Sequence, residues 1–341
     1  MLGIALGLLI TTWAGESPMH ILQILFKSAF GSRYDFGMTL FYATPLIFTG
    51  LAVAIPLQAG LFNIGAEGQL NWGAFAAAVV ASRLSLGASP LAEFFAPILA
   101  PTLAGLAAFS AGALWGAIPG WLRARRGSHE VINTIMLNFI AAGLINYLTL
   151  YIFKNPESQY PETQHIRPEF SLAKWPLFGD APLGAAVVIA FVTAITMGIL
   201  LFYTKFGYRL RAVGRGKTAS EFAGISVAKT RIQALALGGG LAGLVGVSEV
   251  LGNSQCYKVG FSPEFGFMGI AVALLGRARP MSVIFAAFLF GALHKGSADL
   301  DLETEKVTKE VALVFEALVI LAVSAEGVWA QLYSKVRSKK S

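Results

Sequence analysis

A polar, glycine-rich segment interrupts a long apolar stretch of this chain. It covers residues 60–71 and carries one carboxylate, Glu67, between apolar runs at 41–57 and 72–80. Each run belongs to a predicted membrane span, 38–57 or 66–82. Irregular backbone cannot face lipid, because each unpaired N–H or C=O there costs several kcal/mol. The segment must therefore face protein or a water-filled path, and its ionisable residue predicts a functional site of a transport protein.

The composition predicts a multi-pass helical membrane protein. Hydrophobic residues make up 55% of the 341, charged residues only 13%, and the mean hydropathy is +0.65. A soluble domain has about twice that charged fraction. We expect ten membrane segments, at residues 2–13, 38–57, 66–82, 95–121, 131–153, 182–203, 231–251, 264–276, 281–295 and 311–332. Met1 to Trp13 lacks a basic start and a clear cleavage site, so we interpret it as a retained helix and not a signal peptide.

The basic residues predict the orientation. If the N-terminus is cytoplasmic, basic clusters at 123–126, 205–231, 277–279 and 335–340 all lie inside, while most acidic residues lie outside. This bias sets topology, and an even helix count places both termini in the cytoplasm. The net charge of +7 is thereby explained without a nucleic-acid partner. We expect a single domain, 1–341, with a cytoplasmic loop at 204–231, a long external loop at 154–182 and a cytoplasmic tail at 333–341. The external loop is either an ordered partner-binding segment or a solvated connector.

A second interruption resembles the first. Residues 252–269 contain Pro263, Glu264, Gly266 and Gly269 and precede a helix of opposite direction. Corresponding breaks of opposite orientation predict an inverted repeat, with the substrate route between the halves. Phe261 and Glu264 would then border that route.

Within the first interruption, the side chains suit a hydroxylated ligand. Asn63, Gln69 and Asn71 can exchange hydrogen bonds with hydroxyl groups, and Phe62 can stack on a ring. The alternative is a purely structural break in which Glu67 caps backbone amides near a helix start and touches no ligand.

A third polar motif follows the basic run at 123–126. Ser128 is a candidate N-cap, and Glu130 lies in the first turn, where the helix dipole favours an anion. Asn133 and Asn138 then follow at membrane depth. They either line a polar path or bond between helices.

Glycines at 112, 116 and 120, and at 238–246, predict close helix packing. The second group matches a dinucleotide-binding fingerprint only formally, since no strand precedes it.

Residues 205–225 predict a docking element on the cytoplasmic side. Thr218 to Ala223 can form a short surface helix with Ala219 on its small face, ended by Gly224. Gly216-Lys217-Thr218 is not a phosphate-binding loop, because Arg211 stands where that motif needs glycine.

We expect no cofactor on this chain. Cys256 is the only cysteine, which excludes an intrachain disulfide and a metal–thiolate cluster, and we predict no metal site.

Three of these stretches together resemble one family. Residues 45–69, the HEVINTIMLN run at 129–138 and the GRGKTASEFAGI loop are similar to permease subunits of bacterial nucleoside and simple-sugar ABC importers, within the ribose and branched-chain amino acid permease group. The resemblance covers about Phe30 to Val328. Gln58 departs from it, since many relatives have a basic residue there.

The resemblance implies an assembly in the bacterial cytoplasmic (inner) membrane. Two permeases, identical or sister chains, would contact lipid and stand on ABC ATPase subunits that use ATP and Mg²⁺, with an external binding protein or lipoprotein delivering the solute. It also implies a coupling helix, formed by Thr218, Ala219, Glu221, Ala223, Gly224 and Ile225. Phe62, Asn63 and Glu67 would border the path.

We therefore predict an all-α permease that performs no covalent chemistry and carries a nucleoside or related sugar. One alternative is an ion-coupled secondary transporter in which Glu67, Glu249 or Glu316 titrates, although a hydrated acid near the membrane surface is the commoner role for the last two. A membrane enzyme is disfavoured, because paired carboxylates and a nucleophile with its base are missing from the sequence pattern.

Overall fold

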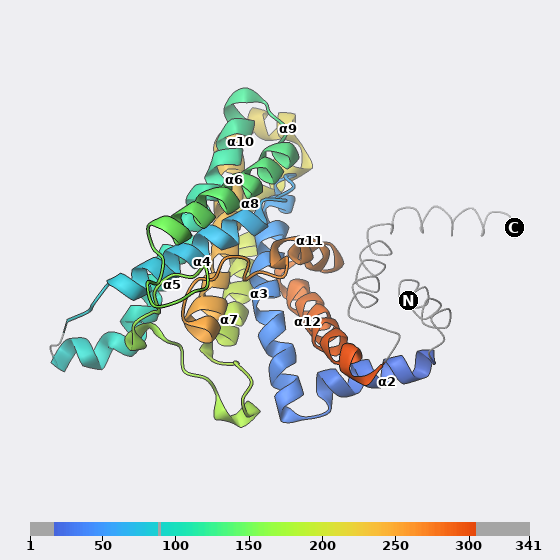
Figure 1. The fold of residues 1–341 in the computed structure, drawn as a ribbon. Helices are drawn as coiled ribbons and strands as arrows, with labels where there is room; N and C mark the ends of the chain where they lie inside the picture. Colours follow the sequence, from blue (N-terminus) through green and yellow to red (C-terminus); the bar gives the residue numbers. More distant parts are fainter. Residues whose placement is uncertain (1–16, 88–89, 305–341) are drawn as a thin grey trace, which may run out of the picture.

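The computed structural model describes residues 17–87 and 90–304, and this part of the chain is helical (Figure 1). Extended structure within these residues is confined to three isolated bridges. Among the described residues, six helices are long and apolar enough to cross a membrane. The helices are α2 (Pro18–Phe30), α3 (Arg33–Gln58), α4 (Ala66–Arg83), α5 (Pro90–Arg126), α6 (Glu130–Tyr151), α7 (Ala185–Tyr203), α8 (Lys205–Arg215), α9 (Lys217–Phe222), α10 (Val227–Gly243), the π-helical η3 (Val247–Ser254), α11 (Phe265–Leu275) and α12 (Pro280–Glu303).

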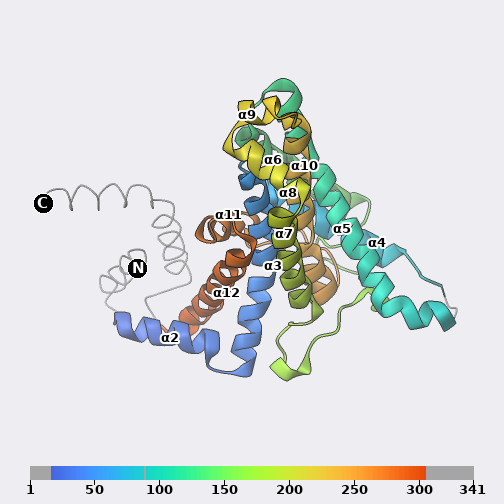
Figure 2. The same cartoon turned by 180° about the vertical axis from the view of Figure 1, so that it is seen from behind.

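Helix α3 is the centre of the molecule. Ser32 caps its start by accepting a hydrogen bond from the Asp35 amide, and an unbroken run of residues from Ala43 to Pro56 is buried. Helices α10, α11 and α12 pack around it, as Figures 1 and 2 show from opposite sides. Helix α3 is apolar on every face, which suits a helix that is surrounded by others or that spans a membrane.

Glycines let α10 approach α5 and α4 closely, as the sequence predicted. A Cβ at Gly239 would lie 2.2 Å from the carbonyl oxygen of Gly112, and one at Gly73 would lie 2.2 Å from the Cα of Gly243. Any side chain there would separate the helices, so the glycines at 238–246 are packing residues, not a nucleotide site.

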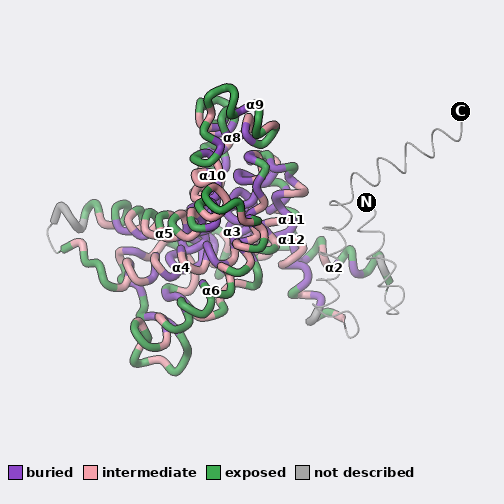
Figure 3. Tube along the Cα trace, turned by 90° about the horizontal axis from the view of Figure 1, so that it is seen from above, coloured by how far each residue is buried: buried purple, intermediate pink, exposed green. Residues whose placement is uncertain are grey.

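Side chains on α5, α6 and α7 face outward. Only 17% of the most apolar window of α5 and of α6 is buried, against 83% for α3 and for Val227–Ser254. Leu114 and Phe139 are among the exposed large residues. Figure 3 shows this division, with buried residues around α3 and exposed ones along the outer helices. Such apolar surfaces suit lipid or another membrane protein.

The predicted segments are confirmed as helices where the structure describes them, with differences at their ends. Segments 2–13 and 311–332, Glu316 and the tail at 333–341 lie outside the described residues. Helix α12 continues to Glu303, although the sequence predicted an external loop after 295. At the start of this extension, Lys295 pairs with Asp299 one turn on and with Asp35 of α3 at 3.4 Å.

Two further elements were not predicted. Helix α2 lies across the end of α3 and packs on α12 with Ile21 and Ile24 buried (Figures 1 and 2). Residues 205–215, expected as loop, form the amphipathic helix α8, capped by the Thr204 hydroxyl that accepts from the Gly207 amide.

The loop at 154–182, predicted to be external, packs on the helices at several points. Its Phe170 is fully buried, the Arg167 amide donates to the carbonyl of Ala81, and the Leu172 amide donates to that of Leu251. These bonds attach the loop to α4 and η3.

Candidate translocation site

The first interruption forms a tight turn between α3 and α4. The α3 helix ends at Gln58, and Gly60 takes a positive φ of 71°, which glycine adopts without strain. The Gln58 side-chain amide donates to the Ala278 carbonyl over 2.8 Å, so this residue anchors the turn to the segment before α12. The chain then enters α4 at Ala66.

Asn63 and Gln69 form a reciprocal amide pair inside this turn. Asn63 donates to Gln69 Oε1 at 2.8 Å, and Gln69 donates back to Asn63 Oδ1 at 3.0 Å. Asn63 also donates to the Ala52 carbonyl of α3, and the two side chains are only 0% and 1% exposed. Their polar groups are therefore used within the protein, which is how buried amides are tolerated.

Asn138 of α6 holds the backbone of the same turn. Its Oδ1 accepts from the Gly68 amide at 2.9 Å, and its Nδ2 donates to the Ile64 carbonyl at 3.0 Å. The first N–H groups of a helix have no intrahelical acceptor, so Asn138 satisfies one of these for α4. The structure thus brings Asn138 to the break, as an interhelical bond.

Glu67 lies where two helices begin. It is in the first turn of α4, and its Oε2 accepts from the amide of Gly266, in the first turn of α11, at 2.8 Å. A Cβ at Gly266 would lie 2.3 Å from the Glu67 nitrogen, so the two helix starts are in contact. Both helix ends carry partial positive charge, and the single carboxylate faces both.

A chain of polar contacts continues from Glu67 toward the external loop. Asn71 donates to the Glu67 carbonyl at 2.8 Å, and the Tyr257 hydroxyl donates to Asn71 Oδ1 at 2.9 Å. The Tyr257 ring lies 5.5 Å from that of Phe261. This chain joins the two interruptions, and Tyr257 is a member that the sequence did not single out.

The other residues predicted to line the path do not all lie at the break. Phe62 and Phe261 are partly buried, and Glu264 is an exposed N-cap residue of α11 with a φ of 63°. Asn133 is apart from the break, since its amide donates to Ser128 Oγ at 2.6 Å near the start of α6. The N-cap of α6 is His129, one residue beyond the predicted Ser128.

Glu249 is buried, where a hydrated acid was expected. It is 7% exposed on η3, and its Oε2 accepts from Asn253 at 3.4 Å. The η3 segment that carries it is π-helical, with hydrogen bonds that span five residues instead of four, a geometry found mostly at functional sites.

The predicted docking helix is present on the face opposite the external loop (Figure 1). It is α9, one residue earlier than expected, and Gly224 ends it with a φ of 76°. Thr218, Ala219, Glu221 and Ala223 are exposed, and Ile225 is partly buried. The sequence missed Phe222, which is 89% exposed and is the most prominent side chain of this helix.

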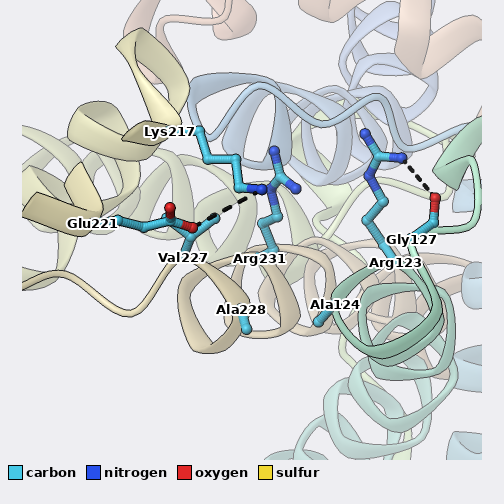
Figure 4. A pocket seen from close by; sticks show the side chains of 8 residues that line it. All are labelled: Arg123, Ala124, Gly127, Lys217, Glu221, Val227, Ala228 and Arg231. Atoms are coloured by element: carbon cyan, nitrogen blue, oxygen red, sulfur yellow. Dashed lines mark hydrogen bonds and ion pairs between the residues drawn. The ribbon is translucent and has the colours of Figure 1, made fainter. Parts of the chain in front are cut away.

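A basic pocket lies beside α9 (Figure 4). Its volume is about 360 Å³, and its charged lining is Arg123, Lys217, Glu221 and Arg231. Arg123 pairs with Glu130 at 3.1 Å and fixes the α5–α6 corner by donating to the carbonyls of residues 127 and 128. Lys217 and Glu221 are 4.0 Å apart. The excess of positive charge favours an acidic partner surface.

Comparison with known proteins identifies the family. The family model for the branched-chain amino acid transport system / permease component matches residues 36–324. The chain belongs to this permease family. It is therefore a multi-pass membrane protein of transport systems, in agreement with its spanning helices.

Individual relatives cover most of the permease. It is 36% identical to the guanosine ABC transporter permease protein NupP of Bacillus subtilis, over 99% of this chain and 95% of that protein. It is 33% identical to the glucose ABC transporter permease protein TsgB13 of Haloferax volcanii, over 89% and 80%. It is 32% identical to the nucleoside ABC transporter permease protein NupB of Lactococcus lactis, over 99% and 92%.

Proposed function

We propose that this permease is the membrane subunit of an ABC importer for a nucleoside or a related simple sugar. The observation that carries the proposal is similarity over 99% of the chain to permeases named for guanosine and for nucleosides. The ion-coupled alternative has no comparable support. ATP hydrolysis, with Mg²⁺, belongs to partner subunits, and this chain contributes binding and conformational change.

The path is proposed to pass the contact between α4 and α11. Helix α11 has 11 residues and is about 16 Å long, half the hydrocarbon thickness. Helices α4 and α11 begin at a shared polar centre, and broken-helix transporters build solute sites on such helix starts. This contact between the two breaks supports the proposed inverted repeat.

Roles within the site follow from the contacts. Asn63, Gln69 and Asn138 use their amides to hold the turn, so they shape the path from behind. Glu67 and Asn71 face the helix junction, and Phe62, Phe261 and Glu264 retain exposed surface. We propose that this second group meets the solute, with Asn133 contributing only at the cytoplasmic end.

The assembly places partners on both faces. The ATPase would receive α9, with Phe222 as its aromatic anchor; buried aromatic anchors dominate many interfaces. A second copy or a sister permease completes the membrane part within lipid, and a binding protein or lipoprotein meets the external loop. We propose a bacterial inner-membrane location with both termini cytoplasmic.

Reconstitution tests the function. The permease is placed in proteoliposomes with its ATPase and binding protein, and uptake of labelled guanosine, uridine and glucose is measured with and without ATP. We expect ATP-dependent nucleoside uptake that stops when the ATPase is omitted. Uptake driven by an ion gradient through the permease alone would contradict the proposal.

The coupling role has its own test. Replacing Ala223 and Gly224 with glutamate should abolish co-purification of the ATPase while the permease still folds. Lys229→Gln, a change of an exposed residue on the adjoining α10, serves as the control. ATPase retained at normal stoichiometry by the double variant would remove α9 from the interface.

A further inference from the structure

Glu162, His165 and Cys256 converge on the external side of the permease, away from the proposed path. One ligand atom from each residue lies within 4.8 Å of the other two. A thiol, an imidazole and a carboxylate form a mixed donor set typical of zinc sites. The sequence could not show it, because 94 residues separate Glu162 from Cys256.

The backbone around these residues holds them in place. The Thr163 amide donates to the Tyr257 carbonyl at 2.9 Å, and the Ile166 amide donates to the Gln255 carbonyl at 2.8 Å. The Tyr257 amide in turn donates to Thr163 Oγ1 at 3.0 Å. Two segments from distant parts of the chain are thus paired around the three donors.

Burial of the carboxylate and of the thiol favours a bound cation at this cluster. Glu162 is 7% exposed and Cys256 is 0% exposed, and the Cys256 thiol points at Glu162 Oε2 over 3.6 Å. Burying a carboxylate is costly unless a cation or several donors compensate it. His165 is exposed, which leaves an entry for an ion and for a water as the fourth ligand.

We propose that Glu162, His165 and Cys256 bind one Zn²⁺ ion and so tie the external loop to the segment that precedes α11. Donors of a tetrahedral zinc are about 3.3 to 3.6 Å apart. The Cys256–Glu162 separation of 3.6 Å already fits, and the separations to His165, which are at most 4.8 Å, can shorten by rotation of this exposed side chain. The thiol proton leaves to solvent as the Zn–S bond forms. No redox change is involved.

The site has a direct connection to the path. Cys256 precedes Tyr257, whose hydroxyl bonds to Asn71 and through it to Glu67. An ion that immobilises residues 255–257 therefore restrains the outer end of this network. We expect external Zn²⁺ to slow uptake and a chelator to restore it.

Cobalt provides the test, because it replaces zinc and reports thiolate ligation by a charge-transfer band in the near ultraviolet. The full-length permease, purified without a polyhistidine tag and without thiol reductants under anaerobic conditions, is titrated with Co²⁺ and then with competing Zn²⁺. We expect one equivalent bound with that band. Cys256→Ser should abolish the band, and Glu162→Gln and His165→Ala should each weaken binding by about 100-fold.

His20→Ala is the matched control, since His20 is an exposed histidine on α2. It should bind cobalt as the unchanged protein does. A titration without the band, a band that persists in Cys256→Ser, or normal affinity in both Glu162→Gln and His165→Ala would overturn the site. The assay needs neither ATPase nor solute, so its failure would leave the proposed transport function untouched.

Discussion

Glu67 offers the most direct test of the proposed path, because one carboxylate serves two helix starts. Its Oε2 accepts the Gly266 amide at 2.8 Å, and its own position is the first turn of α4. Glu67→Gln keeps the size and one acceptor but removes the charge. Glu67→Ala removes the acceptor as well and leaves the Gly266 amide unpaired at the junction.

The structure sets the size of each effect. A charge near a helix N-terminus stabilises by about 0.3–1 kcal/mol, and more when partly buried, and two termini share this carboxylate. Loss of charge should therefore cost about 1–2 kcal/mol. An unsatisfied buried donor adds about 1–3 kcal/mol, so the alanine variant should lose about 2–4 kcal/mol.

These energies convert to populations. If the junction holds one conformation of the transport cycle, a loss of 1–2 kcal/mol shifts the equilibrium by about 5- to 30-fold. We expect uptake in proteoliposomes to fall by about that factor in Glu67→Gln and further in Glu67→Ala, with ATPase assembly retained. Glu303→Gln, at an exposed residue that ends α12, is the control. Normal uptake and an unchanged thermal midpoint in both Glu67 variants would refute this reasoning.

Three further predictions concern packing, assembly and the turn. Gly239→Ala should destabilise the fold by about 3 kcal/mol, because the added Cβ would meet the Gly112 carbonyl; thermal unfolding in detergent measures this. Gly198→Ala is the control and should be neutral, since a Cβ there meets nothing within 4 Å. Phe222→Asp should prevent ATPase co-purification without changing the thermal midpoint, since Phe222 is 89% exposed; equal recovery of the ATPase would contradict a docking role. Asn138→Ala should cost about 1–3 kcal/mol by leaving the Gly68 amide and the Ile64 carbonyl unpaired, and an unchanged midpoint would show that water replaces both bonds.

The helical segments were predictable because apolar runs of sufficient length leave few other structures in a bilayer. The break at 60–65 and the short α9 were predictable for a local reason: glycine at 60 and at 224 permits backbone that other residues resist, and both take positive φ. The sequence predicted less wherever a contact joins residues far apart in the chain. The extension of α12 past residue 295, for example, begins at Lys295, which pairs with Asp35 of α3.

For the polar residues of the break, the sequence predicted a location near membrane depth. It did not predict their hydrogen-bond partners. Asn63 could equally have met a solute, and only the fold shows that its amide bonds to Gln69 and to the Ala52 carbonyl. Tyr257 was overlooked because nothing local distinguishes it from other loop aromatics.

The sequence by itself determined that this chain is a helical membrane protein, broken at two polar points, with a basic segment and a short helix at 217–222. Each of these properties follows from hydrophobicity, charge or backbone freedom within a few neighbouring residues. The tertiary structure alone decided which side chains satisfy one another, that Glu67 faces two helix starts, and that Glu162, His165 and Cys256 meet. Such contacts join residues far apart in the chain, and side-chain identity does not specify a distant partner until helix packing fixes the distances.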